Sequence, residues 1–168
     1  MMKKIRRQLT LFADKADALE IEYIRSEYNP IQKAMIDCHI TLCREDEITH
    51  LDKVLVNLSA LKFHQLICQL GKPKLFEDEK GIFIPVYDSE SQFNELRTRI
   101  LKNGIEAPRI QNPHITLLHP RNSVCSQDIF IDIVKRQLPA QLTFKTISLI
   151  EQKNDEKWKI LRTFKLLN

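Results

Sequence analysis

Two identical tetrapeptides contain the residue types in this sequence that are best suited to chemistry. Residues 39–42 and residues 114–117 both read His-Ile-Thr-Leu. In a β-strand, successive side chains point to opposite faces, so each copy is expected to present an imidazole and a hydroxyl on one face and two apolar side chains on the other. Two such strands facing each other across a cleft would form a site with two histidines and two threonines.

The chemistry that such a site offers is paired proton transfer. Histidine has an unperturbed pKa of about 6.5, so it accepts or donates a proton near neutral pH. With two histidines, one can take a proton from an attacking group while the other gives a proton to a departing group. Hydroxyl donors on the same face can stabilise the charge that develops between them. His39 and His114 are therefore candidate catalytic residues, and Thr41 and Thr116 are candidate substrate-binding residues.

A single His-x-Thr on a strand is more often a half-buried sheet residue than a catalyst, so the elements around the two copies decide the interpretation. Apolar periodicity, capping residues and turn residues predict an alternation of strands and helices. In chain order, the expected elements are a strand at 8–13; a helix at 15–28, capped by Asp14 and stopped by Asn29-Pro30; a strand at 39–42; a helix around 51–58 with Thr49 and Asp52 as a capping box; a strand at 63–70; a hairpin of 74–76 with 82–84; a helix opened by Ser89 and closed by Gly104; a strand at 114–117; a helix from Ser126 to Leu138; and a hairpin of strands 142–151 and 158–167 about a turn at 154–156.

The two tetrapeptides have similar surroundings in this order of elements. Each is preceded by a strand and an amphipathic helix, and each is followed by another helix and at least two strands. They lie 75 residues apart, close to half of the 168-residue chain. The order predicts a duplicated, pseudo-twofold α+β fold: a single domain over residues 1–168, with two lobes built from antiparallel sheets and covering helices around a central cleft.

With this spacing and order, the paired motifs resemble the 2H phosphoesterases, a superfamily that includes 2′-5′ RNA ligases and cyclic phosphodiesterases. That superfamily has two His-x-Thr/Ser-x motifs with apolar residues at each x, and both copies here satisfy the pattern. The resemblance covers the chain from about residue 8 to its end. It implies a bilobed fold with a central cleft, no metal and no cofactor.

The resemblance also implies an activity, in which a phosphodiester at a ribose 2′-oxygen is opened or formed. The simplest form is hydrolysis of a 2′,3′-cyclic phosphate of RNA or a nucleotide, with His39 and His114 as acid and base and with Thr41 and Thr116 on the phosphate. The sequence does not decide which histidine is the base. Arg121, four residues beyond the second motif strand, is a further candidate for phosphate binding because an arginine can pair with phosphate in a bidentate fork.

Three alternatives remain open. The enzyme could be an ATP-independent 2′-5′ RNA ligase, because joining is the opening of a cyclic phosphate by a 5′-hydroxyl in place of water. It could cleave 2′-5′-linked oligonucleotides. It could also be a non-catalytic RNA-binding module with the same cleft. Three aromatic residues, Phe83, Tyr87 and Trp158, are candidates for stacking on a base, although packing in the sheets would explain them equally well.

The composition bounds these interpretations. A chain that is 43% hydrophobic and 29% charged is typical of a soluble globular protein, and the net charge of +4 permits an anionic substrate. The basic start leads into no apolar run of signal-peptide or membrane-span length, so we expect a cytoplasmic protein with no membrane contact. We also expect a monomer. His119 lies five residues after His114, an odd offset that places it on the opposite face if the strand continues, so it is a poor partner for His114 in a metal site.

Overall fold

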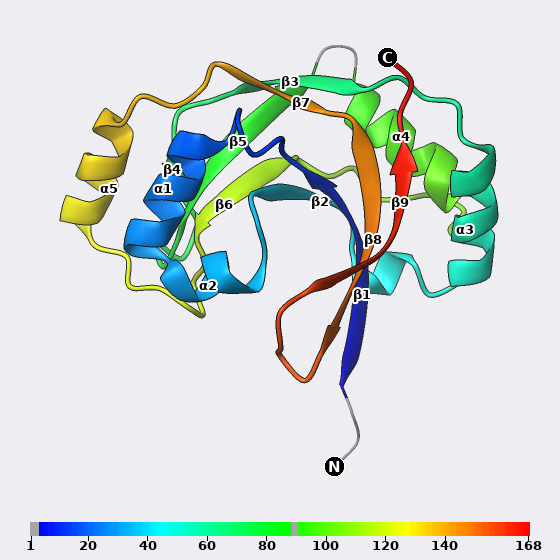
Figure 1. The fold of residues 1–168 in the computed structure, drawn as a ribbon, viewed down its shortest axis with the longest axis horizontal. Coiled ribbons are helices and arrows are strands. Elements are labelled where there is room, and N and C mark those ends of the chain that lie inside the picture. The colour runs from blue at the N-terminus through cyan, green and yellow to red at the C-terminus, as the bar shows by residue number, and fades with distance from the viewer. Residues whose placement is uncertain (1–3, 89–90) are drawn as a thin grey trace.

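Two antiparallel sheets and their covering helices form the protein, as the computed structural model of residues 4–88 and 91–168 shows (Figure 1). The elements are β1 (Ile5–Phe12), α1 (Leu19–Tyr28), α2 (Pro30–Met35), β2 (His39–Cys43), the 3-10 helix η1 (Glu45–Glu47), α3 (Leu51–Ala60), β3 (Leu66–Leu70), β4 (Lys74–Leu75), β5 (Ile82–Asp88), α4 (Gln92–Leu101), β6 (His114–Leu118), α5 (Gln127–Lys135), β7 (Gln141–Phe144), β8 (Thr146–Lys153) and β9 (Lys159–Lys165). The expected α+β class is confirmed.

The strands that carry the two tetrapeptides, β2 and β6, lie at neighbouring edges of the two sheets. The first sheet has the order β2-β1-β8-β9. In the second, β6 pairs with β5, β5 pairs on its other side with β3 and β4, and β3 pairs with β7. Strands β2 and β6 contact each other, so the two sheets meet where the motifs are (Figure 1).

The strand pairs β1–β2 and β5–β6 have the same register. His39 lies opposite Phe12, and His114 lies opposite Pro85. Thr41 lies opposite Thr10 and Thr116 opposite Phe83, in each case two positions before the residue that faces the histidine. Both ladders then slip by one residue, which leaves Leu42 in β2 and Leu117 in β6 as the extra residue of a β-bulge. Even the irregularity is therefore duplicated, in agreement with the expected pseudo-twofold relation.

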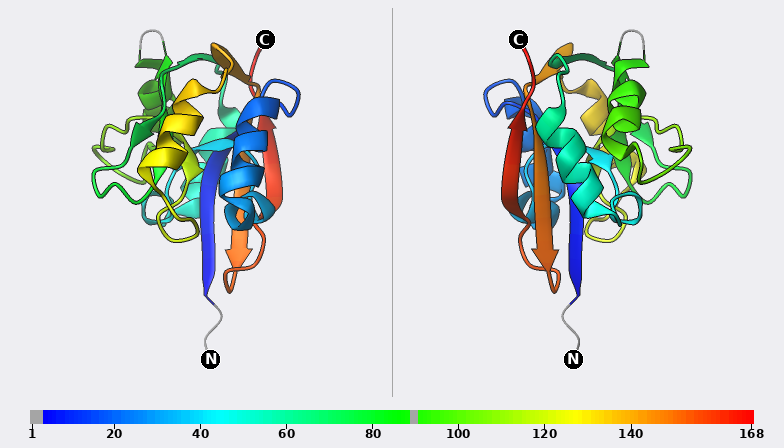
Figure 2. Two further views of the ribbon diagram at one scale, coloured as in Figure 1. Left: turned by 90° about the vertical axis from the view of Figure 1, so that its left-hand side faces the viewer. Right: turned by 90° about the vertical axis from the view of Figure 1, so that its right-hand side faces the viewer.

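The helices cover the sheets in a crossed arrangement. Helix α1, which precedes the first motif, contacts β6 of the second, and α4, which precedes the second motif, contacts β2 of the first. Helix α5 stands beside α1 on one side of the molecule, and α3 stands beside α4 on the other (Figure 2). Tyr28 ties α1 to α5 by donating to Asp132 at 2.6 Å, and Arg136, directly after α5, pairs with Glu27 at 2.6 Å. Each motif strand is thus supported by a helix from the other half.

The largest departure from the expected elements is in residues 142–151. They form two strands in different sheets, because β7 pairs with β3 whereas β8 lies between β1 and β9. Lys145 separates the two strands and is exposed. The apolar alternation changes phase here, because Leu142 and Phe144 lie at even positions whereas Ile147 and Leu149 lie at odd ones. The change of phase coincides with the point where the chain passes from one sheet to the other.

Several helix ends also differ from expectation. The first helix begins at Leu19 because Asp14 accepts a hydrogen bond from the Ala16 N–H at 3.0 Å in a turn instead of capping a helix. Pro30 does not only end α1; it is the first residue of α2, where its missing N–H costs nothing.

Two further capping predictions are wrong. The residue that caps α3 is His50, without a side-chain bond, so Thr49 and Asp52 form no capping box. Helix α4 ends at Leu101, and Asn103 instead of Gly104 takes the left-handed conformation. Ser89 lies outside the described residues.

Two local predictions are confirmed. The Ser126 hydroxyl accepts from the Ile129 N–H at 3.2 Å and caps α5. The β8–β9 hairpin turns at Asn154 and Asp155, both in the left-handed region.

Candidate active site

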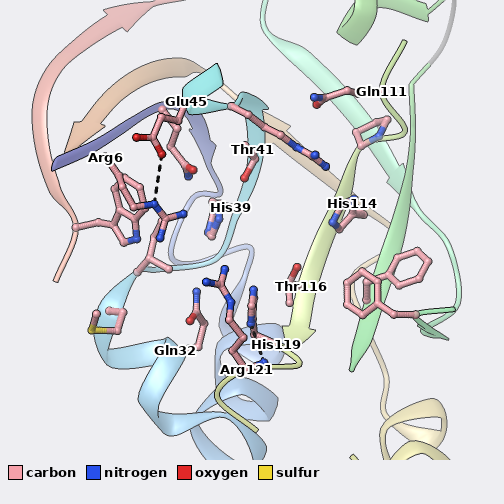
Figure 3. Close-up of a pocket in the computed structure, with 18 of the residues that line it drawn as sticks. Arg6, Gln32, His39, Thr41, Glu45, Gln111, His114, Thr116, His119 and Arg121 are labelled. Atoms are coloured by element: carbon pink, nitrogen blue, oxygen red, sulfur yellow. Dashed lines mark hydrogen bonds and ion pairs between the residues drawn. The ribbon is translucent and has the colours of Figure 1, made fainter. Parts of the chain in front are cut away.

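A cleft of about 1750 Å³ lies where β2 and β6 meet, and all five sequence-derived site residues line it. His39 and Thr41 project from β2 on one wall, and His114 and Thr116 project from β6 on the other (Figure 3). The alternation within each motif explains this placement, since the residues between and after them, Ile40 and Ile115 among them, are buried in the core.

Both motif histidines are anchored in the same way. The Nδ1 atom of His39 lies 2.7 Å from the Asp37 carbonyl oxygen, and Nδ1 of His114 lies 3.1 Å from the Asn112 carbonyl oxygen. A carbonyl oxygen only accepts, so Nδ1 carries the hydrogen in each ring. In the neutral form, Nε2 is then an unprotonated nitrogen that can accept a proton from a group in the cleft.

The surroundings of His39 favour its neutral form. Burial, followed by the nearby charges of Arg25 and His114, lowers the pKa of His39 to about 4, although the bond to the Asp37 carbonyl acts in the opposite direction. Arg25 is itself only 1% exposed and is held by Glu22 at 2.8 Å and by the Ile36 carbonyl at 2.7 Å. At neutral pH, His39 is therefore ready to accept a proton.

The surroundings of His114 are aromatic. Phe76 and Phe83 meet the imidazole edge-on, with ring centroids 5.9 and 5.5 Å away, and their own centroids are 4.7 Å apart. On the other side of the cleft, Arg6 lies over the ring of Trp158 at 5.4 Å. Phe83, Tyr87 and Trp158, the three aromatic residues singled out from the sequence, all line the cleft.

Each bulge is completed by a buried polar side chain from the opposite half. In the first bulge, the Leu42 carbonyl accepts a hydrogen bond from Nη1 of Arg97 in α4. In the second, the Leu117 carbonyl accepts from Nδ2 of Asn29, at the end of α1, at 3.0 Å. Arg97 and Asn29 are both 0% exposed. A buried backbone carbonyl needs such a partner. These two residues therefore couple the helices of one half to the motif strand of the other.

Glu47 in η1 is the centre of an ion-pair network beside the first motif. Arg97 donates to its two oxygens at 2.5 and 3.1 Å, Arg109 donates at 3.1 Å, and Gln111 donates at 3.2 Å. Burial alone would raise the pKa of Glu47, but the hydrogen bonds from Arg97, the Arg44 N–H and Arg109 outweigh it and lower the pKa. The network ties the turn after the first motif to the segment that leads into the second.

Sequence reasoning missed this network. The one local signal is an arginine among the apolar residues of α4, whose buried side includes Leu96, Arg97 and Ile100. A charged group in that position requires a partner. The partner lies 50 residues away along the chain, and no periodicity identifies it.

The turn after β6 places Arg121 and His119 in the cleft (Figure 3). Asn122 fixes this turn by donating to Gln32 of α2 at 2.6 Å. The expectation that His119 faces away from His114 applies to a strand that continues to residue 119, whereas β6 ends at Leu118. The bulge at Leu117 also shifts the alternation by one residue, so His119 lines the cleft. The remaining histidines, His50 and His64, do not line the cleft.

The charges along the cleft are mostly positive. Among the described residues, neither Arg44 nor Arg121 has an ion pair with a carboxylate, whereas Arg109 is paired with Asp46 and Glu47. Within residues 4–88 and 91–168, no group of three or more His, Cys, Asp or Glu side chains is arranged to hold a metal ion. No helix in this part of the chain has the length and apolarity needed to cross a membrane. The free basic groups favour an anionic ligand.

Comparison with solved structures identifies the fold. The chain superposes on E. coli LigT complexed with 3′-AMP with a TM-score of 0.66 at 12% identity, over 97% of this chain and 98% of LigT. A phosphoesterase gives a TM-score of 0.66 at 13% identity over 97% and 98% of the two chains. TT0787 of Thermus thermophilus gives 0.58 at 15% identity over 95% and 97%.

E. coli LigT has also been solved with phosphate, with ATP and with NADP+. No protein-family model matches the sequence. No curated protein sequence is significantly similar to it either. At these identities the likeness establishes the shared fold, and it extends over nearly the whole chain.

Proposed function

We propose that this protein is a 2H phosphoesterase, a single two-lobed domain over residues 1–168 that hydrolyses ribose 2′,3′-cyclic phosphates of RNA or nucleotides. One observation carries the proposal. Two His-x-Thr pairs face one cleft from strands with the same register and the same bulge, and both histidines have Nδ1 bonded to the carbonyl two residues earlier. If the motifs served only to pack the sheets, neither the matching bulges nor the matching Nδ1 hydrogen bonds would be required.

In the proposed reaction, His39 is the base and His114 is the acid. Nε2 of His39 takes a proton from water while the water oxygen forms a bond to phosphorus. The bond from phosphorus to one ribose oxygen breaks, and His114, which acts in its protonated form with a hydrogen on each ring nitrogen, gives its Nε2 proton to that oxygen and keeps its hydrogen on Nδ1. The product is a phosphomonoester, and proton exchange with solvent restores both rings. The lowered pKa of His39 supports its assignment as base.

Thr41 and Thr116 bind the phosphate in this proposal. Each hydroxyl is on the same face of its strand as the motif histidine, so the two reach the phosphoryl oxygens from opposite walls. Negative charge increases on these oxygens as the water attacks, and donors already in place stabilise it without reorganisation. Arg121, exposed at the rim, adds a positive charge to the same region.

The size of the cleft favours a substrate larger than a cyclic phosphate alone. A nucleotide needs room and apolar surface for its base, and the Phe76–Phe83 pair beside His114 offers both. The nucleotide and phosphate ligands of E. coli LigT are consistent with this choice of substrate class.

Ligation and cleavage of 2′-5′ linkages use the same four residues. A 5′-hydroxyl in place of water gives a 2′-5′ phosphodiester, and microscopic reversibility then assigns cleavage of that bond to the same groups with acid and base exchanged. A different class of function, an RNA-binding module without turnover, would show salt-dependent RNA binding and no product.

The test is phosphorus NMR of the products from a small panel. The panel contains a 2′,3′-cyclic mononucleotide, RNA with a cyclic phosphate end, ADP-ribose 1″,2″-cyclic phosphate and 2′-5′ oligoadenylate. We expect a phosphomonoester from at least one cyclic phosphate, with EDTA present, because the reaction as written needs no metal. RNA binding without any product would favour the binding module.

A further inference from the structure

His119, the third histidine of the cleft, has a hydrogen bond of the opposite polarity to those of His39 and His114. The Arg121 backbone N–H donates to its Nδ1 at 3.2 Å. A backbone N–H only donates, so Nδ1 must accept and the neutral ring carries its hydrogen on Nε2. In the motif histidines the hydrogen is on Nδ1 and Nε2 is bare.

The position of His119 directs this Nε2–H into the site. In Figure 3 its ring stands beside Thr116 and the Arg121 side chain, below His39, and the nitrogen that is not bonded to the Arg121 N–H points toward the cleft. The backbone of His119 is also fixed, because its carbonyl accepts from the Asn122 N–H at 3.0 Å and from the Ser123 hydroxyl at 2.8 Å. The donor is therefore held in place before a ligand arrives.

The charge state of His119 suits a hydrogen-bond donor more than an acid. Burial first, and then the positive charges of Arg121 and Arg6, lower its pKa. These surroundings favour the uncharged ring, in which Nε2 carries the hydrogen. It can donate to an anion, but it cannot take a proton through the same atom.

The equivalent position in the other half of the molecule also presents hydrogen-bond donors to the cleft. Arg44 follows His39 by five residues, as His119 follows His114, and the bulge at Leu42 brings it to the cleft side in the same way. Among the described residues, its guanidinium has no ion pair with a carboxylate. Both halves therefore place N–H groups where an anion would lie.

We propose that His119 is a phosphate-binding residue that donates its Nε2–H to a non-bridging oxygen of the substrate phosphate and takes no part in proton transfer. This inference rests on the proposed function, since it names a third donor for the same phosphate beside Thr41 and Thr116. Its role differs from that of the motif histidines because its neutral ring carries the hydrogen on Nε2, whereas theirs carry it on Nδ1.

Two substitutions separate this role from a role in the turn. In His119→Asn, the amide oxygen can still accept from the N–H two residues later, as in an Asx-turn, but the side chain ends one bond short of Nε2. His119→Ala loses both functions. We expect both variants to reduce kcat/KM for the cyclic nucleotide by about 10–100-fold, the effect of one hydrogen bond to a charged group. Wild-type kcat/KM in His119→Asn would overturn the proposal.

A second measurement is independent of turnover. In protein with ¹⁵N-labelled histidines, the neutral ring of His119 should have its hydrogen on Nε2, and those of His39 and His114 on Nδ1. Inorganic phosphate should shift the His119 Nε2 resonance and bind about tenfold more weakly to His119→Asn. His64→Asn, outside the cleft, is the matched control and should bind phosphate like the wild type.

A His119 ring with its hydrogen on Nδ1, or an Nε2 resonance that phosphate leaves unmoved, would overturn the inference. These outcomes are distinct from failure of the proposed function. If phosphate binds through His119 but no member of the substrate panel is hydrolysed, the proposed activity fails while the phosphate-binding role stands.

Discussion

The two halves of the cleft have the same backbone but different neighbours. The register, the bulge and the Nδ1 anchor are duplicated, yet His39 lies near the buried Arg25 whereas His114 lies against Phe76 and Phe83. The backbone decides where an imidazole stands, and the neighbours decide its proton affinity and what it contacts. A symmetric scaffold can in this way hold two histidines for unlike tasks.

The turns that follow the motifs differ as well. The turn after the first motif is held by Glu47 through charged bonds to Arg97 and Arg109, while the turn after the second is held to α2 by the uncharged pair Asn122 and Gln32. Charge-assisted bonds are roughly twice as strong as neutral ones. The turn after the first motif is therefore held by the stronger bonds.

The strongest test of the comparison removes each motif histidine in turn. We expect His39→Ala and His114→Ala each to lower kcat for the cyclic nucleotide by about 10²–10⁴-fold, because each removes one proton transfer. The double variant should lose little more, since the two groups act in one step. Steady-state kinetics would measure this, with His50→Ala as a control. Near-normal turnover in either single variant would mean that the half concerned has no catalytic role.

The next largest effect concerns stability. Glu47→Ala should lower the free energy of unfolding by about 3–5 kcal/mol, because it leaves the guanidinium of Arg97 buried without its carboxylate. Asn122→Ala, on the other side, should cost only about 1 kcal/mol. Denaturant unfolding of both variants would compare the two turns. Equal losses would contradict the difference in bond strength between the two turns.

Replacing the motif threonines tests whether both walls bind the phosphate. Thr41→Val and Thr116→Val keep the shape of the side chain and remove the hydroxyl, so each should lower kcat by about 10²-fold, as the loss of an oxyanion donor does. The exposed Thr163→Val on β9 should leave the rate unchanged. If only one of the two motif variants is impaired, the phosphate contacts a single wall.

The smallest expected effect is the pH dependence of stability caused by His39. Its pKa is about 4 in the folded protein and about 6.5 when unfolded, so between these values the unfolded chain binds more protons. Stability should be unaffected above pH 6.5 and should fall by about 1–3 kcal/mol as the pH drops to 4. His39→Gln should lack this component. Denaturant unfolding at several pH values would measure the free energy of unfolding of both proteins. If it changes with pH equally in the two, the lowered pKa is refuted.

Much of the local structure could be predicted from the sequence. The Ser126 cap, the turn at Asn154 and the apolar faces of α3 and α4 depend on residues within a few positions of one another. Lys145 and Thr146 interrupt the alternation within residues 142–151, but this local signal does not say which strand each part pairs with. Pairing partners, not propensity, decided the division between the two sheets.

The site shows the same limit in more detail. The His-x-Thr motifs, by themselves, determined that an imidazole and a hydroxyl share one face of each strand, since that alternation is a property of the backbone. Only the tertiary structure decided that the two faces meet at one cleft, that Arg97 and Asn29 complete the bulges, and that the bulge at Leu117 brings His119 into the site. These features depend on contacts between residues far apart in the chain, which no local pattern specifies.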